Sequence, residues 1–426
     1  MSKSLSPEAE VTLLLTAPLT MVGRKRGRED SPRLLTFAEY AKLARGLQDC
    51  GRHLGDLIGP RGGEILEECQ AGIESTRVHQ LLRRGFQLSQ AVEHWAARAI
   101  WVVSQADADY PSRIRQRLGG AAPPMIYGCG DRNLLQHGGL AVVGSRHVSE
   151  RLIEYAEGIG RIAATADISI ISGGARGVDQ AAMRGALNRG GTAIGVLADG
   201  LEKFVMQREN RAALMDDRLT LISPYDPQAG FSVGNAMNRN KVVYALADAG
   251  LVVDAAYNKG GTWAGAVEQL EKLRLVPVYV RTDGERSRGL EALQRKGARS
   301  WPNPKAPEDF RVALLNSRKY SEAEALWKST FLAVPADMAK SANDIALPTP
   351  LSGPTKRVDV QGLSPAGALF EKVEELLRSI DMPTTESAVA ASLQVSKTQA
   401  REWLKRLVLE GKYKRSTRPV RYDRIS

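Results

Sequence analysis

Two short glycine-containing turns carry arginines in a pattern that suits an anion. Gly144-Ser145-Arg146 directly follows an apolar run at 140–143, and the Ser-Gly-Gly-Ala-Arg-Gly turn at 172–177 follows another at 168–171. Each turn leads into a helical pattern, where backbone N–H groups and the helix dipole favour negative charge. Glycine lets the main chain approach that charge closely, and arginine offers a phosphate a planar fork of donors. The two turns therefore predict a phosphate-binding cleft between them.

A parallel sheet must position these turns. The apolar runs at 140–143, 168–171 and 192–197 alternate with helical patterns at 150–166 and 178–187. Short, wholly apolar strands that alternate with helices predict a parallel sheet covered on both faces. In such sheets ligands bind at the carboxyl ends of the strands, where both turns fall.

Two later segments extend the predicted cleft. Arg239-Asn240-Lys241 is expected to open a helix that runs to about residue 248. Cations at a helix N-terminus oppose the helix dipole, an arrangement that makes more sense if an anion lies nearby. Lys259-Gly260-Gly261-Thr262 opens another helix and offers a third anion site. Phe231, in the preceding loop, either stacks a nucleobase or plugs the edge of the core. The predicted phosphate- or DNA-binding residues are Gly144, Ser145, Arg146, Ser172, Gly173, Gly174, Ala175, Arg176, Gly177, Arg239, Asn240, Lys241, Lys259, Gly260, Gly261 and Thr262.

Common nucleotide-binding motifs do not fit these turns. Neither turn has the G-x-G-x-x-G spacing of a dinucleotide site, and Ser172 stands where a ribose-binding acid is expected. A P-loop is excluded because the G-x-x-x-x-G-K-[ST] pattern does not occur in the sequence. A glycine after a strand often serves only as a tight turn, but two such turns, each with an arginine, favour a ligand.

Together the segments at 144–146, 172–179 and 239–241 resemble the DNA-processing protein A family (DprA, also called Smf) over roughly residues 110–280. The resemblance implies an extended Rossmann fold that binds single-stranded DNA, tends to form homodimers, and hands strands to the recombinase RecA in natural transformation. The sequence departs from the family at 236–241, where Phe-Pro-x-Arg-Asn-Arg is usual, and at 259–262, where Ser-Gly-Ser is usual. A divergent branch that acts in phage defence, with a partner protein of that system, is a second interpretation.

Two other classes of function stay open. Arg239, Gly260-Gly261-Thr262 and Glu268 resemble, in their order, the LOG-type nucleotide phosphoribohydrolases, which implies a nucleotide N-glycoside hydrolase. A sensor of a nucleotide signal is the other alternative. The central segment shows no paired acids, no nucleophile–histidine pair and no metal-ligand spacing, so no catalytic residue, cofactor or metal is predicted. A non-enzymatic single-strand binder is therefore the leading hypothesis.

Composition supports a polyanionic partner. The chain of 426 residues has a formal net charge of +11. Its three cysteines, Cys50, Cys69 and Cys129, match no metal or redox spacing and are typical of reduced thiols in a cytoplasmic protein. The sequence contains no membrane-spanning run and no signal-peptide pattern, so a cytoplasmic protein without membrane contact is expected.

The chain divides into four predicted parts. Residues 1–109 read as a helical domain, in which Thr36 and Glu39 form a capping-box pattern. Residues 110–330 form the Rossmann-like DNA-binding domain, and 331–363 form a proline-containing linker. Residues 364–426 have the proportions of a winged helix.

Within the predicted winged helix, Thr384 or Thr385 caps a second helix, a third runs from 397 to 409, and a two-stranded wing follows at 413–425. From residue 397 onward the sequence contains ten Lys and Arg and three acids, and this local excess of +7 fits duplex DNA. Such domains also dock proteins, so both partners stay open. The predicted duplex contacts are Lys397, Thr398, Gln399, Arg401 and Lys405.

Overall fold

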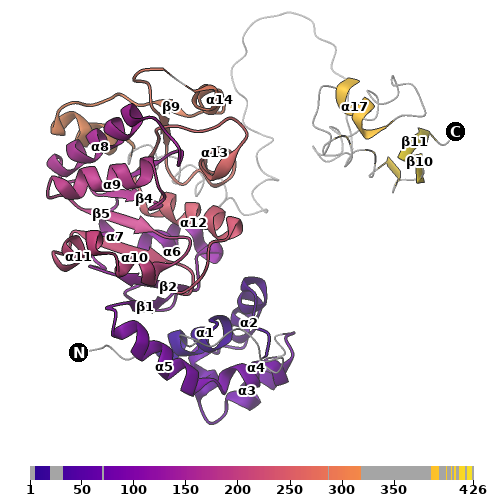
Figure 1. Ribbon diagram of the computed structural model, residues 1–426. Helices are drawn as coiled ribbons and strands as arrows, with labels where there is room; N and C mark the ends of the chain where they lie inside the picture. Colours follow the sequence, from indigo (N-terminus) through magenta and orange to yellow (C-terminus); the bar gives the residue numbers. More distant parts are fainter. Residues whose placement is uncertain are drawn as a thin grey trace, which may run out of the picture. The chain divides into compact units, whose positions relative to one another are not determined.

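The computed structural model describes residues 5–19, 32–69, 72–285 and 287–317, and, nearer the C-terminus, 385–392, 400, 404, 407–408, 412–417 and 420–424. The chain separates into two compact units, Met1–Ala339 and Lys340–Ser426. Each unit is described by itself (Figure 1).

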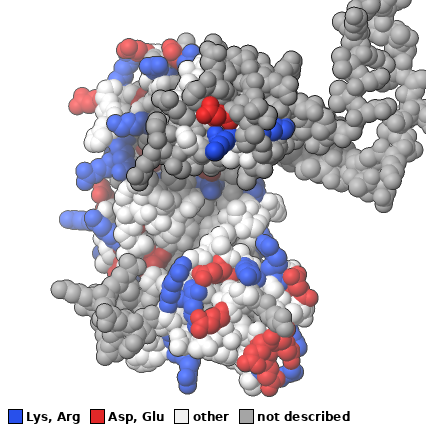
Figure 2. Space-filling view, turned by 90° about the vertical axis from the view of Figure 1, so that its right-hand side faces the viewer, with Lys and Arg blue, Asp and Glu red and all other residues white. Residues whose placement is uncertain are grey.

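Helices fill the described part of the chain before residue 100 (Figure 1). Their inward-facing leucines and valines, such as Val11, Leu43 and Leu81, form a separate small core. Figure 2 shows Lys and Arg interspersed with Asp and Glu over the described part of these helices. The elements are α1 (Pro7–Thr16), α2 (Phe37–Asp49), η1 (Leu54–Ile58), α3 (Gly62–Glu68), α4 (Ser75–Leu82) and α5 (Gly85–Ala96).

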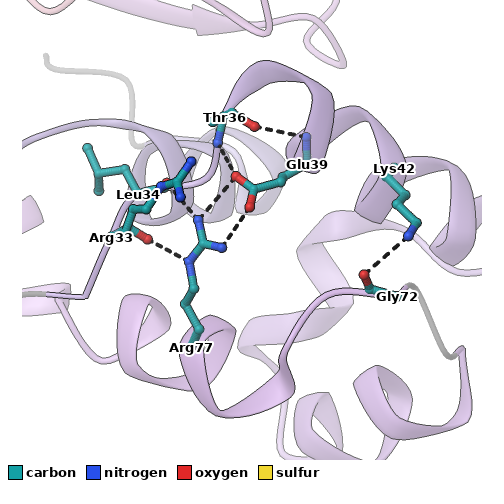
Figure 3. Close-up of polar contacts among 7 residues, drawn as sticks. All are labelled: Arg33, Leu34, Thr36, Glu39, Lys42, Gly72 and Arg77. Atoms are coloured by element: carbon teal, nitrogen blue, oxygen red, sulfur yellow. Dashed lines mark hydrogen bonds and ion pairs between the residues drawn. The ribbon is translucent and has the colours of Figure 1, made fainter.

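The predicted capping box at the start of α2 is confirmed, and it also fastens α4 (Figure 3). The Glu39 carboxylate accepts hydrogen bonds from the Thr36 backbone N–H at 2.7 Å and from the Arg77 guanidinium at 2.7 Å. Arg77 also donates to the backbone carbonyls of Arg33 and Leu34, each at 2.7 Å. The hydrogen bonds from Arg77 and Thr36 hold the pKa of Glu39 well below its ordinary value of 4.5.

The lowered pKa predicts a pH-dependent contribution to stability. A carboxyl group with a depressed pKa stabilises the fold above its ordinary pKa, and this stabilisation is lost as the pH falls toward the depressed value. Glu39→Gln is expected to lower the midpoint of urea denaturation at pH 7, and the gap to the parent protein is expected to narrow below pH 4.5. Circular dichroism at a series of pH values measures both midpoints.

Lys42→Met is the matched control, because the Lys42 ammonium donates to the Gly72 carbonyl at 3.2 Å and its bond involves no carboxylate (Figure 3). Its effect is expected to stay constant over the same pH range. A Glu39→Gln effect that is equally constant would contradict the assigned role of the Glu39 charge.

The predicted α/β fold with a Rossmann-like sheet is confirmed (Figure 1). The sheet has the order β1-β2-β6-β5-β4-β3-β7-β8-β9 and is parallel from β6 to β9. At the other edge β1 and β2 run antiparallel, and β1 joins the sheet before residue 110. The strands are β1 (Trp101–Ser104), β2 (Met125–Cys129), β3 (Leu140–Val143), β4 (Ile170–Ser172), β5 (Ala193–Val196), β6 (Leu219–Ser223), β7 (Ala249–Val252), β8 (Val278–Val280) and β9 (Arg299–Ser300).

Helices cover both faces of the sheet because alternate strand residues point to opposite sides. Leu140 and Val142 of β3 pack in one core with α8 and α9, whereas Ala141 and Val143 pack in another with α12 and α13. Strands buried on both faces explain the continuous apolar runs of the sequence. The helices of this part are α6 (Ser112–Leu118), η2 (Gly119–Ala121), α7 (Leu134–His137), α8 (Glu150–Thr165), α9 (Val178–Asn188), α10 (Leu201–Val205), α11 (Arg208–Met215), α12 (Val233–Leu246), α13 (Gly260–Glu268), η3 (Gln269–Leu273) and α14 (Arg288–Arg295).

The sheet has a topological switch point at β3. The chain proceeds from β3 through β4 and β5 to β6 on one side, and then returns to pair β7 with the opposite edge of β3. Helices that leave neighbouring strands for opposite faces open a crevice at such a point. The carboxyl ends of β3 and β7 therefore frame the expected ligand site.

The second unit contains α17 (Glu386–Ser392) and a hairpin of β10 (Tyr413–Thr417) and β11 (Val420–Arg424). The Thr385 hydroxyl accepts a hydrogen bond from the Ala388 N–H at 3.2 Å, which confirms the predicted helix cap. The predicted two-stranded hairpin is likewise present, and the Tyr422 hydroxyl donates to Glu386 at 3.1 Å. The winged helix as a whole stays a prediction. The linker 331–363 and the proposed contacts Lys397, Thr398, Gln399, Arg401 and Lys405 lie outside the described residues.

Candidate nucleic-acid interface

A cavity of about 770 Å³ lies at the switch point between β3 and β7. Its walls are the turn after β3, one side of α12, and the turn that runs from Ala256 to the first residues of α13. It unites predicted site residues from four segments of the chain. Those lining it are Gly144, Ser145, Arg146, Ala175, Arg239, Asn240, Lys259, Gly260, Gly261 and Thr262.

The position of this cavity corrects the predicted cleft between the turns after β3 and β4. The second turn contributes only Ala175 to the lining; the Ser172 hydroxyl donates to the Val142 carbonyl at 2.6 Å, and Arg176 is exposed outside the cavity. The helices that follow β3 and β4 pack on the same face, so no crevice opens between these strands. The predicted residues outside the lining are Ser172, Gly173, Gly174, Arg176, Gly177 and Lys241.

The prediction that Arg239-Asn240-Lys241 opens a helix is wrong. The Ser232 hydroxyl caps α12 by accepting a hydrogen bond from the Asn235 N–H at 3.5 Å, so the three residues lie in the middle of the helix. Successive helical side chains point in different directions. Arg239 and Asn240 thus face the cavity, whereas Lys241 lies 3.5 Å from the Glu268 carboxylate.

A buried carboxylate, missed in the sequence, organises both glycine turns. Asp179, on the first turn of α9, accepts hydrogen bonds from the backbone N–H groups of Gly144 at 3.3 Å and Gly173 at 3.1 Å. Burial raises the pKa of Asp179, and the charge of Arg239 and these backbone bonds oppose the rise. The two amides expected to hold a phosphate therefore already hold a carboxylate. The signal available in the sequence was the position of Asp179, an acid only two residues after the glycine turn ends at Gly177.

Arg239 supplies the strongest unsatisfied donor in the cavity. Its side chain is only 6% exposed, and its Nε has no hydrogen-bond partner among the described residues. Burial lowers the pKa of Arg239, the charge of Asp179 opposes this, and the charge of Arg146 adds to it. A methyl group on Gly173 would overlap the Arg239 guanidinium, so a larger residue there would displace this side chain. A buried cation whose hydrogen-bond donors are incompletely used favours the binding of an anion.

Other predicted residues hold the walls together. The Ser145 hydroxyl donates to Asp254 at 2.6 Å, and the Thr262 hydroxyl donates to the Gly144 carbonyl at 2.9 Å. The Asn240 amide donates to the Gly261 carbonyl at 3.1 Å. These three side chains therefore join the turn after β3, α12 and α13 into one frame.

The groups that face an incoming anion are the arginines and the start of α13. Arg146 is exposed at the rim, with its guanidinium carbon 5.1 Å from the centre of the Phe231 ring. The first-turn amides of α13 have no partners within the helix, and Lys259 at the N-cap forms no side-chain cap. Cations and helix amides thus converge on one cavity.

The acid required by the hydrolase hypothesis lies elsewhere. Glu268 does not line the cavity and instead pairs with Lys241. Of the described residues that form the lining, Asp179 is the only carboxylate, and it is held by backbone amides. Among the described residues no cluster of His, Cys, Asp or Glu is placed to hold a metal ion. No described helix is long and apolar enough to cross a membrane.

The region of this chain that is similar to known proteins includes the nine-stranded sheet. The family model described as DNA recombination-mediator protein A matches residues 101–309. A DNA processing protein DprA of Mycobacterium tuberculosis is 27% identical over 345 residues, which cover 72% of this chain and 82% of that protein. Protein Smf of Escherichia coli is 33% identical over 184 residues, 41% of this chain and 48% of that protein. The chain belongs to the DNA-processing protein A family.

The fold agrees with this family. The X-ray structure of DNA processing protein A from Streptococcus pneumoniae superposes with a TM-score of 0.50 and 23% identity, covering 65% of this chain and 93% of that one. The shared architecture is the Rossmann-like sheet that forms the cavity in this DprA-family chain.

The role of Asp179 predicts a large cost for its amide replacement. Asp179→Asn puts an NH₂ group where two backbone donors need acceptors, and each buried unsatisfied group costs about 1–3 kcal/mol. The variant is expected to unfold at a clearly lower temperature in differential scanning calorimetry. Asp167→Asn, at an exposed position, is the control and is expected to match the parent. An equally stable Asp179→Asn protein would refute the assignment.

Proposed function

We propose that the cavity between β3 and β7 binds the phosphate backbone of single-stranded DNA, and that the protein is a non-enzymatic DNA-binding component of DNA processing and recombination. The observation that carries the proposal is Arg239, which is buried in the cavity and whose Nε has no hydrogen-bond partner among the residues that the structure describes. Arg146 and the first turn of α13 add donors on two other walls. Membership in the DNA-processing protein A family supports the same class of ligand.

The depth of Arg239 favours a single strand over a duplex. A flexible strand can direct one phosphate into a cavity while its bases point away, whereas paired strands hold their phosphates on a stiff cylinder. Contacts of this kind carry little sequence information, because every nucleotide has the same phosphate. Affinity should fall steeply with salt, since bound cations are released from the strand.

Arg146→Ala tests the phosphate contacts. A charge-assisted hydrogen bond contributes about 1.5–3 kcal/mol, so the variant is expected to bind oligothymidine and mixed-sequence strands about 10- to 100-fold more weakly. The slope of log affinity against log salt should decrease by about 0.7 for each phosphate contact removed. Fluorescence anisotropy at several salt concentrations measures both quantities.

Arg161→Ala is the matched control, because it removes one positive charge from α8, where Arg161 lies 3.6 Å from Glu157 and does not line the cavity. It is expected to bind like the parent protein. Arg239→Gln, with folding checked by circular dichroism, is expected to weaken binding further than Arg146→Ala. If all three variants bind like the parent, the strand lies elsewhere.

Incubation with nucleoside monophosphates is expected to release no base, whereas release would favour the hydrolase.

The wider role is also part of the proposal. The chain works in the cytoplasm as a homodimer and passes its strand either to RecA during transformation or to a partner protein in phage defence. Its free cysteines suit a reducing compartment. The neighbouring genes distinguish the two pathways, since competence genes indicate the first and a defence island the second.

The C-terminal segment is proposed to bind duplex DNA as a winged helix. Deletion of residues 364–426 removes the local +7 charge that begins at residue 397, so it is expected to reduce duplex binding and spare single-strand binding. Parallel titrations with a labelled duplex and a labelled single strand of equal length measure how the deletion changes each affinity. If the deletion abolished single-strand binding and spared duplex binding, the C-terminal segment would be the single-strand binder, contrary to the proposal.

A further inference from the structure

One exposed aromatic ring lines the cavity and another lies in a turn whose neighbouring residues line it, and each ring is paired with an arginine. Phe231 is 52% exposed and lies in its wall, with Arg146 over its ring. Tyr257 is 42% exposed, and the guanidinium carbon of Arg288 lies 4.7 Å from its ring centre. Isolated exposed apolar residues are common, but a ring and arginine pair that occurs in the cavity wall and again on the adjoining turn is a more specific arrangement.

Tyr257 is held firmly next to the cavity. It stands between Ala256 and Lys259, which both line the cavity. Its ring meets that of buried Trp263 edge-on, with centres 5.2 Å apart and planes at 70°. The N-terminus of α14, which carries Arg288, is fixed to the same turn because the Ser287 hydroxyl donates to the Ala255 carbonyl at 3.2 Å.

An exposed, immobilised ring beside a phosphate site suits an unpaired base. Nucleobases stack on aromatic side chains and on arginine planes, and every base has a face that can do so. Phe231 lines the cavity near the start of α12, whereas Tyr257 follows β7 in the turn whose residues Ala256 and Lys259 form another wall. A strand whose phosphate enters between them carries bases toward both.

We propose that Tyr257, together with Arg288, is a nucleobase-stacking platform, and that it and Phe231 receive bases on either side of the phosphate bound in the cavity. This inference rests on the proposed single-strand function and deepens it, because it identifies an unpaired, base-bearing strand as the ligand. Bases in a duplex are already stacked on their neighbours and cannot occupy the two rings. The platforms thus select single strands without selecting their sequence.

Tyr257→Leu removes the flat ring and keeps an apolar side chain against Trp263. It is expected to weaken binding of oligothymidine by about 5- to 100-fold, the usual effect of losing one stacked base. An abasic strand of the same length has the phosphates without the bases, so the variant and the parent should bind it equally. Tyr257→Phe keeps the ring and is expected to bind oligothymidine like the parent.

Each outcome separates this inference from the proposed function. If Tyr257→Leu binds oligothymidine like the parent while Arg146→Ala is weakened, the platform is wrong and the phosphate site stands. If Tyr257→Leu loses the abasic strand to the same extent, Tyr257 only supports the wall and the platform is again wrong. If the parent protein binds neither strand, the proposed function itself fails. Phe231→Leu, tested in the same way, decides whether the first ring acts alone.

Discussion

The hydrogen bonds of one buried carboxylate set the shape of the site. Asp179 takes backbone donors from the turns after β3 and β4 and so holds two strand ends in register from the start of α9. A buried carboxylate is stable only when its oxygens are hydrogen-bonded or paired with a cation, and here backbone amides and the neighbouring charge of Arg239 share that task. The charge of Arg239 stabilises the Asp179 carboxylate, while its own Nε has no acceptor in the described part of the chain.

The remaining walls are fixed by polar side chains that bridge separate elements. Ser145, Thr262 and Asn240 each use a hydrogen bond to join one wall to another, and Lys241 pairs with Glu268 to link α12 with α13. A cavity whose walls are already tied loses little conformational freedom when a ligand enters. This favours binding by a preformed frame, with the arginines as the adaptable part.

The sequence allowed the elements of this fold to be predicted, but not the way they meet. The strand at 140–143 and the capping box at Thr36 are local patterns, and both are present. That β7 rather than β4 frames the cavity depends on pairing across more than 100 residues, which no local pattern contains. The start of α12 was misplaced because Ser232 is followed by Val233 and Gly234, which have low helix propensity, so the cap was not apparent. The contacts expected from Lys397 to Lys405 fall where the structure describes too few residues to test them.

The same arrangement bears on the proposed binding role of the cavity and on the hydrolase hypothesis. Hydrolysis needs an acid or base free to exchange a proton with the substrate, and Asp179, the carboxylate in the described lining, is committed to backbone amides. Glu268, the other acid considered for catalysis, faces Lys241 instead. What the cavity does offer is donors: a buried guanidinium, an exposed one at the rim, and the open first turn of α13. Binding energy can come from satisfying these donors, and a strand of phosphates supplies the acceptors without any bond being broken.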